Sequence, residues 1–175
     1  MKRLVSILLF SLSFWGLQAQ EGIPLLDKVA GHRVHFHYTY SLSRAGADFA
    51  PVTDGQVTVE GNAYILEGLG MKVLSDGTTR WTLDPEAKEA VVEAVQKEDL
   101  FTNPALFIRS YRQYMDKLKV NSSSSDALDV TLTLDENTRA RFVLTGIKFL
   151  EKQGKSDFVL DTKSLGKSYV ITDLR

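Results

Sequence analysis

The chain has 175 residues, enough for one globular domain with a sizeable core, and it contains no cysteine. The lack of cysteine excludes disulfide bonds, thiolate metal sites, cysteine nucleophiles and a lipid-modified N-terminal cysteine. The 21 Lys and Arg residues nearly balance the 22 Asp and Glu residues and are mixed along the chain, so nothing indicates a basic face for nucleic acid.

The first 19 residues have the pattern of a secretory signal peptide. A positive start (Lys2, Arg3) precedes an apolar segment that ends at Trp15, and the small residue Ala19 suits the position before a cleavage site. The apolar segment is shorter than the roughly 20 residues that a membrane-spanning helix needs. We therefore expect residues 20–175 to be a single exported domain in the periplasm; the alternative is a buried N-terminal helix.

The next elements are a short helix and several strands. Residues 22–31 predict a helix, with Pro24 near its start and a glycine past its end. Segment 33–42 alternates apolar and polar residues, which indicates a half-buried strand. A loop is expected over 43–55. Segments within 56–84 are rich in β-branched and aromatic residues and are broken by glycines, which is typical of an antiparallel meander.

The Ser-Asp-Gly sequence at 75–77 predicts a hairpin turn with its glycine in the left-handed conformation. A three-residue loop places Met71 opposite Trp81, whereas a two-residue loop places Val73 opposite Arg80. We prefer the first register, because a slip of one residue would mix the two faces. One face then carries Leu69, Met71, Val73, Trp81 and Leu83.

Two segments in the middle of the chain have helical character. Residues 84–98 favour a helix by propensity, but the alternation of Ala90 and Val92 with polar neighbours favours a strand. Residues 103–118 are a clearer helix, because Asn103 can cap it and a proline follows at its first position. Its apolar stripe comprises Phe107, Tyr111, Tyr114, Met115 and Leu118.

The sequence predicts mostly strands in the C-terminal part of the chain. The polar stretch 121–126 is predicted to be a linker and not a catalytic serine motif. Segment 128–134 alternates cleanly, with its leucines and its valine pointing inward. Segments 140–152, 157–162 and 168–174 continue in strand style to the end of the chain.

The stretch from Gly61 to Val92 contains a motif formed by Ser75, Asp76, Gly77, Thr79 and Trp81, followed by Pro85-Glu86 and by the helix start Asn103-Pro104-Ala105-Leu106. In order and spacing the chain resembles the outer-membrane lipoprotein carrier family, the LolA-like proteins. The resemblance implies an α+β, mostly antiparallel fold, an incomplete curved β-barrel (half-barrel) whose concave face is covered by helices. It also implies a strand at 87–95. One departure is the stretch 60–64, which lacks the basic residue that ties down the lid in the best-known carriers.

The resemblance also implies a non-enzymatic periplasmic carrier that binds acyl chains of lipoproteins or related lipids and shuttles them towards the outer membrane. Its partners would be an inner-membrane export complex and an outer-membrane receptor, with no cofactor, and it would act as a monomer. Each CH₂ group buried is worth about 0.8 kcal/mol, so such a carrier needs a concave apolar surface and a displaceable cover. The candidate groove residues are Val34, Phe36, Tyr38, Tyr40, Val57, Val59, Met71, Val73 and Trp81. The candidate lid residues on the 104–118 helix are Phe107, Tyr111, Tyr114 and Met115.

Three alternatives compete with this prediction. The groove and lid residues could form an ordinary closed core. The same fold could serve as a protein- or peptide-binding or sensor module. A metal-dependent hydrolase could be built on His35 and His37, but spacing supplies no third ligand, so we predict no metal site. We also find no nucleophile elbow, phosphate loop or zinc-protease motif, and so expect no enzyme activity.

Overall fold

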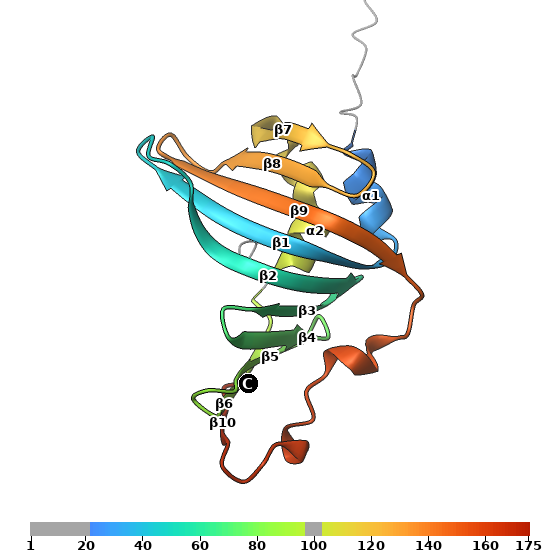
Figure 1. Ribbon diagram of the computed structural model, residues 1–175, viewed down its shortest axis with the longest axis vertical. Coiled ribbons are helices and arrows are strands. Elements are labelled where there is room, and N and C mark those ends of the chain that lie inside the picture. Colours follow the sequence, from blue (N-terminus) through green and yellow to red (C-terminus); the bar gives the residue numbers. More distant parts are fainter. Residues whose placement is uncertain (1–21, 97–102) are drawn as a thin grey trace, which may run out of the picture.

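The residues that the computed structural model describes, 22–96 and 103–175, form one open sheet of ten strands with two short α-helices on one side (Figure 1). The strands are β1 (Arg33–Arg44), β2 (Ala50–Glu60), β3 (Ala63–Gly68), β4 (Met71–Ser75), β5 (Thr79–Asp84), β6 (Glu89–Ala94), β7 (Leu118–Ser123), β8 (Leu128–Thr133), β9 (Thr138–Leu150) and β10 (Val170–Asp173). Their order across the sheet is β10-β6-β5-β4-β3-β2-β1-β9-β8-β7. Neighbours pair antiparallel, except that β10 runs parallel to β6. The predicted mostly antiparallel β fold is confirmed at this level.

The helices are short. They are α1 (Pro24–Ala30), α2 (Pro104–Ser110) and the 3-10 helices η1 (Tyr111–Lys117), η2 (Lys155–Phe158) and η3 (Thr162–Ser164). None of the described helices has the length and apolar character that a membrane crossing requires. The predicted signal peptide, residues 1–19, lies outside the described residues.

Strand β1 defines the two faces of the sheet. Val34, Phe36, Tyr38 and Tyr40 are at most 3% exposed and point to the side that carries α1 and α2, which we call the inner face. The polar residues between them point to the opposite, outer face. The inner-face residues of β1, β2, β8 and β9 and the apolar side chains of both helices share one core cluster. The alternation predicted for 128–134 is confirmed, because Leu128, Val130 and Leu132 are buried in this cluster.

The two predicted helices exist, with one difference. Helix α1 begins at Pro24, as expected. At the start of α2 the side chain of Asn103 accepts a hydrogen bond from the amide of Leu106, which makes it the predicted cap. After Ser110 the chain tightens into the 3-10 helix η1, and Leu118 already begins β7. The helix predicted over 103–118 is therefore α-helical only in its first two turns.

Four other predicted segments can be compared with the observed strands. The strand at 87–95 is confirmed as β6. The loop predicted over 43–55 is confirmed only at residues 45–49, because β1 extends to Arg44 and β2 begins at Ala50. The linker predicted at 121–126 is wrong for its first half, which belongs to β7. The strand predicted at 157–162 is wrong, since η2 ends at Phe158, η3 begins at Thr162, and the residues between them form no strand.

Both registers considered for the 75–77 hairpin are wrong. Leu74 pairs with Trp81, and Ser75 pairs with Arg80. The turn lies between Asp76 and Thr79: the Asp76 amide donates to the Thr79 carbonyl, and the Asp76 side chain accepts hydrogen bonds from the amides of Thr78 and Thr79. The positive φ of its glycine, 93°, is confirmed.

The correct register separates residues that were assigned to one face. Met71 and Val73 point to the inner face, whereas Leu74, Trp81 and Val92 form a second, smaller core on the outer face. Leu160, from the segment between η2 and η3, packs against this second core. Trp81 therefore cannot line a groove on the inner face.

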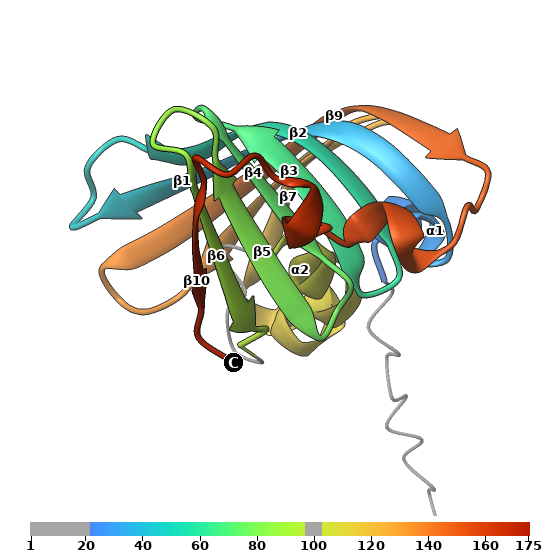
Figure 2. The same ribbon diagram turned by 90° about the horizontal axis from the view of Figure 1, so that it is seen from below.

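We call β3 to β6 the arm of the sheet. After β9 the C-terminal segment runs along the arm, where it forms η2 and η3, and it ends as β10 at the edge of the arm (Figure 2). Phe158 is fully buried, and the Arg33 guanidinium lies 5.1 Å from its ring centre. Arg33 also pairs with Asp157 at 2.9 Å and with Glu60 at 3.4 Å. These contacts fix the segment to the outer side.

Two glycines mark the place where β3 stops following β2. A Cβ atom on Gly55 would lie 2.3 Å from the carbonyl oxygen of Glu67, and one on Gly68 would lie 2.3 Å from that of Asp54. Both distances are too short for any side chain. Only glycine therefore allows the two backbones to approach this closely. Gly55 pairs with Tyr38 of β1 and therefore sits on the inner face.

Candidate functional site

The predicted groove falls into a closed part and an open part. Six of its residues (Val34, Phe36, Tyr38, Tyr40, Val57 and Val59) are at most 3% exposed and pack in the main core with α1 and α2. Phe107 of α2 stacks on Phe142 of β9 with ring centres 4.1 Å apart. In this structure the covered part of the inner face is therefore filled by protein side chains.

The inner face continues onto the arm, where it is only partly covered. Leu66 and Val73 are half-buried and pack against the edge of the main core, and Met71 is 41% exposed. Cross-strand pairing joins Val57 to Leu66 and Leu66 to Val73, so these side chains form one row across β2, β3 and β4. The sequence analysis missed Leu66, although the two-residue alternation with the buried Tyr64 could have found it.

The lid residues occupy the expected side of their helix. Phe107 and Tyr111 are buried in the main core, and Tyr114 and Met115 are half-buried and pack against it. The stripe therefore faces the inner face of the sheet. Three of the lid residues, Tyr111, Tyr114 and Met115, belong to η1, whose 3-10 hydrogen bonds are weaker than those of an α-helix.

A polar cluster, which we call the Asp27 cluster, joins α1 to the start of η1. The hydroxyl of Tyr111 donates a hydrogen bond to Asp27 and accepts one from the amide of Ile23 at 3.0 Å. The guanidinium of Arg112 donates two hydrogen bonds to Asp27, at 2.6 and 3.1 Å. The hydrogen bond from Tyr111, followed by that from Arg112, lowers the pKa of the Asp27 carboxyl below its usual 3.8.

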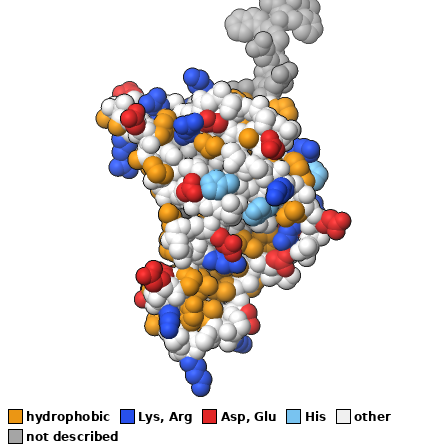
Figure 3. Space-filling view, viewed as in Figure 1, with side chains coloured by type: hydrophobic (Ala, Val, Ile, Leu, Met, Phe, Trp, Pro, Cys, Tyr) orange, Lys and Arg blue, Asp and Glu red, His pale blue; other side chains and the backbone are white. Residues whose placement is uncertain are grey.

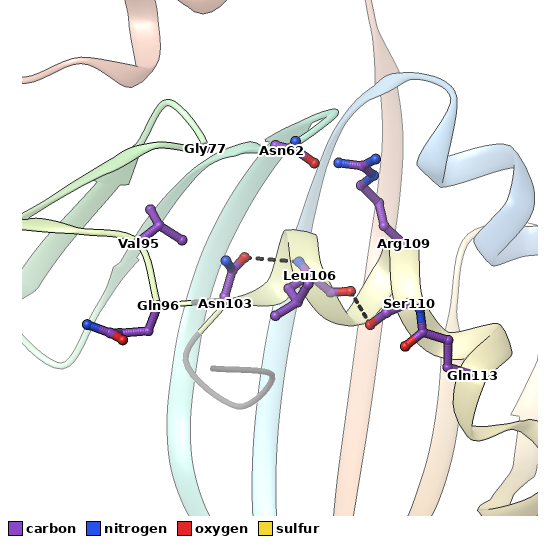
Figure 4. A pocket seen from close by; sticks show the side chains of 9 residues that line it. All are labelled: Asn62, Gly77, Val95, Gln96, Asn103, Leu106, Arg109, Ser110 and Gln113. Carbon is purple, nitrogen blue, oxygen red and sulfur yellow. Dashed lines mark hydrogen bonds between the residues drawn. The ribbon is translucent and has the colours of Figure 1, made fainter. Parts of the chain in front are cut away.

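A pocket of about 350 Å³ opens between the lid and the turns of the arm (Figure 4). It is lined by Asn62, Gly77, Val95, Gln96, Asn103, Leu106, Arg109, Ser110 and Gln113. Arg109 of α2 extends towards Asn62 of the β2–β3 turn, and Leu106 lies at the base of the lid. The pocket thus places amide and guanidinium groups beside a helix whose other side packs on the core.

Tyr38, one of the candidate groove residues, has an unusual environment. Tyr38 is fully buried, and its hydroxyl has no hydrogen-bond partner among the described residues. Burial also raises the pKa of this phenol above its ordinary value of 10. A buried hydroxyl without a hydrogen-bond partner costs about 1–3 kcal/mol.

The two strand histidines lie on the outer face. His35 contacts the Thr58 hydroxyl at 3.0 Å, and His37 contacts Asp54 at 3.3 Å. Histidine side chains are visible over β1 and β2 in Figure 3. Within residues 22–96 and 103–175, no group of three His, Cys, Asp or Glu side chains could hold a metal.

No protein-family model and no curated protein matches this chain. The described residues offer an apolar inner face, a helical cover that the Asp27 cluster joins to α1, and a polar pocket beside that cover.

Proposed function

We propose that this protein is a periplasmic carrier that binds acyl chains of lipoproteins or related lipids and shuttles them towards the outer membrane. In this proposal the bent sheet is an incomplete half-barrel, and α1 and α2 cover its concave face. Export rests on the signal-peptide pattern of residues 1–19. The protein's task is non-covalent binding and release, and it performs no catalysis.

The observation that carries the proposal is the continuity of the inner face. The apolar row from Val57 through Leu66 to Val73 leads from the covered core to the partly open arm. An acyl chain can first contact the open end of this row and then extend beneath the lid. A chain of about twelve CH₂ groups would gain about 10 kcal/mol from complete burial, which exceeds the cost of displacing a few lid contacts.

The lid itself supports the same proposal. Helix α2 is only seven residues long, and its continuation η1 is fastened to α1 by the Asp27 cluster at the protein surface. Such a segment can open without breaking a strand pair, because its fastening involves two helices and no strand. The unpartnered Tyr38 hydroxyl beneath the cover adds a group that a ligand's polar atom can satisfy.

A second candidate is a protein- or peptide-binding module on the same fold. The close packing of the six covered groove residues favours it, because a permanently filled core leaves only surface grooves for a partner. The two candidates differ in whether the inner face accepts an alkyl chain.

The experiment is titration of residues 20–175 with a fluorescent C16 fatty acid. Val73→Asp places a charge on the open part of the inner face, and it should weaken uptake at least tenfold, because a carboxylate facing an alkyl chain is strongly unfavourable. The matched control is Leu83→Asp, a half-buried leucine on the outer face of the adjacent strand β5. It should bind as wild type does once both variants are shown to be folded.

Two results would contradict the carrier proposal. One is a wild-type protein that takes up no fatty acid at micromolar concentrations, and the other is equal loss of uptake in both variants. Native mass spectrometry of protein isolated from a periplasm provides the second measurement. Bound lipid or acylated peptide is expected, and a bound unmodified peptide would support the binding module instead.

A further inference from the structure

A second pocket, of about 300 Å³, lies on the outer face of β7, β8 and β9, away from the lid. Its charged lining consists of Lys119, Asp129, Arg139 and Arg141, and Phe49 closes one side. Figure 3 shows Lys and Arg side chains gathered at the upper left of the molecule, near β8, β9 and the β1–β2 hairpin. From this pocket we infer a binding site for a phosphate monoester.

The strand registers explain why three cations meet here. Thr131 of β8 pairs with Lys119 of β7 on one side and with Arg141 of β9 on the other, so the two cations flank it in one row. Arg139 lies two residues before Arg141 and therefore on the same face of β9. The residues between and after them, Ala140 and Phe142, are buried on the inner face.

The pocket contains more positive than negative charge. Arg141 is paired with Asp129 through two hydrogen bonds, at 2.6 and 3.0 Å, and Asn121 donates a third hydrogen bond to the same carboxylate. Arg139 donates a hydrogen bond to the hydroxyl of Ser43, and within the described part of the chain neither Arg139 nor Lys119 has a carboxylate partner. Two positive charges are thus available to a ligand.

The two arginines are also held in place. The guanidinium carbons of Arg139 and Arg141 lie 5.6 and 6.0 Å from the ring centre of Phe49. Cation–π contacts of this kind orient the guanidinium plane, and Asp129 fixes Arg141 from the other side. A site whose donors are already oriented loses less entropy when a ligand binds.

The charge and the donors select the ligand class. A phosphate monoester carries a charge of about −1.5 to −2 near pH 7, which matches the two available cations, whereas a diester carries only one charge. Its three terminal oxygens can accept hydrogen bonds from a guanidinium and an ammonium together. The ester can belong to a soluble metabolite or to a lipid headgroup. This inference does not rest on the proposed carrier function, because the site lies on the opposite face of the sheet.

The test is calorimetric titration of residues 20–175 with inorganic phosphate and with glycerol phosphate at constant ionic strength. We expect saturable binding that weakens about tenfold in Arg139→Gln and in Lys119→Gln, since a hydrogen bond between charged groups contributes on that order. The matched control is Lys148→Gln, an exposed lysine further along β9, which should bind as wild type does. In a parallel arm, co-sedimentation compares phosphatidylcholine vesicles with and without phosphatidic acid.

Binding in either arm that is lost in both pocket variants supports the site, and the arm that responds identifies the source of the phosphate. Response to glycerol phosphate indicates a soluble ester, whereas response to phosphatidic acid vesicles alone indicates a headgroup. The inference is overturned if neither arm shows binding, or if Lys148→Gln weakens binding as much as the pocket variants. Vesicle binding that is independent of phosphatidic acid, with no response to the soluble esters, overturns it as well.

Discussion

The hydroxyl of Tyr111 donates a hydrogen bond to the carboxylate of Asp27, a residue 84 positions earlier in the chain. This bond joins the lid to helix α1 and not to a strand of the sheet. Arg112, the next residue, donates to the same carboxylate. One aspartate thus holds the junction of α2 and η1. Because this aspartate is exposed, its contacts can break in water without leaving a buried charge.

The first prediction concerns the Asp27 cluster. Asp27→Asn removes the charge that Arg112 pairs with, so the lid should open more often while the sheet keeps its stability. We expect several-fold faster amide hydrogen exchange over residues 104–117 and little change in β1 and β9. Asp116→Asn, an exposed aspartate of η1, is the control. Faster exchange throughout the sheet would show that Asp27 supports the whole fold and not the lid alone.

The second prediction is the pH dependence of lid closure. The pKa of Asp27 is lower in the folded protein than its ordinary value of 3.8, because Tyr111 and Arg112 donate to its charged form. A lowered pKa means that the stabilisation is complete above about pH 4 and is lost as the pH falls through the folded-state pKa. Fatty acid uptake should therefore rise on acidification, and exchange over 104–117 should rise relative to the intrinsic exchange rate of an unprotected amide at each pH. The difference between wild type and Asp27→Asn should disappear at low pH; a difference that persists there would contradict the assignment.

The third prediction uses the outer-face core. Trp81 is the single tryptophan of residues 20–175, and Leu160 packs against its cluster. Leu160→Ala should shift the Trp81 emission to longer wavelength and destabilise the protein by about 1–2 kcal/mol, less than the 2–5 kcal/mol typical of a fully buried leucine. Saturation with fatty acid should leave the emission of the wild-type protein nearly unchanged. A large spectral change on ligand binding would place Trp81 at the ligand after all.

The fourth prediction concerns two tyrosines of the same core. Tyr38→Phe removes a buried hydroxyl without a partner, so it should leave stability unchanged or raise it by about 1–3 kcal/mol. Tyr111→Phe removes a hydroxyl that donates to Asp27 and accepts from Ile23, so it should lower stability. Thermal unfolding of both variants measures the contrast. If Tyr38→Phe is the more destabilising change, the Tyr38 hydroxyl has a partner in solution, such as a buried water.

The structural features predicted most accurately are those that depend on local sequence, such as the alternation of a strand or the capping residue of a helix. The period of two in β1 and β8 identified the inner face, and Asn103 was found as the cap of α2. The strand at β6 followed from the family resemblance, against its helical propensity. In the folded chain β5 and β10 flank it on both sides, and these pairings outweigh the local preference.

The errors have different physical causes. The register of the β4–β5 hairpin follows a turn between Asp76 and Thr79, which the Asp76 side chain holds by two hydrogen bonds, and this register places Trp81 on the outer face. The turns of η2 depend on Arg33, which is more than a hundred residues away in sequence, so no local pattern could predict them. The basic pocket was missed because its three cations come from two strands that are distant in sequence, β7 and β9, and form no motif.

The contact between Gly55 and Gly68 has a consequence for the open end of the inner face. Since no side chain fits between the Gly55 and Gly68 backbones, they set how closely β3 follows β2 and hence the tilt of the arm relative to β1 and β9. Replacement of either glycine by alanine would have to push the arm outward. The open end of the inner face would then change its width although every side chain that lines it stayed the same.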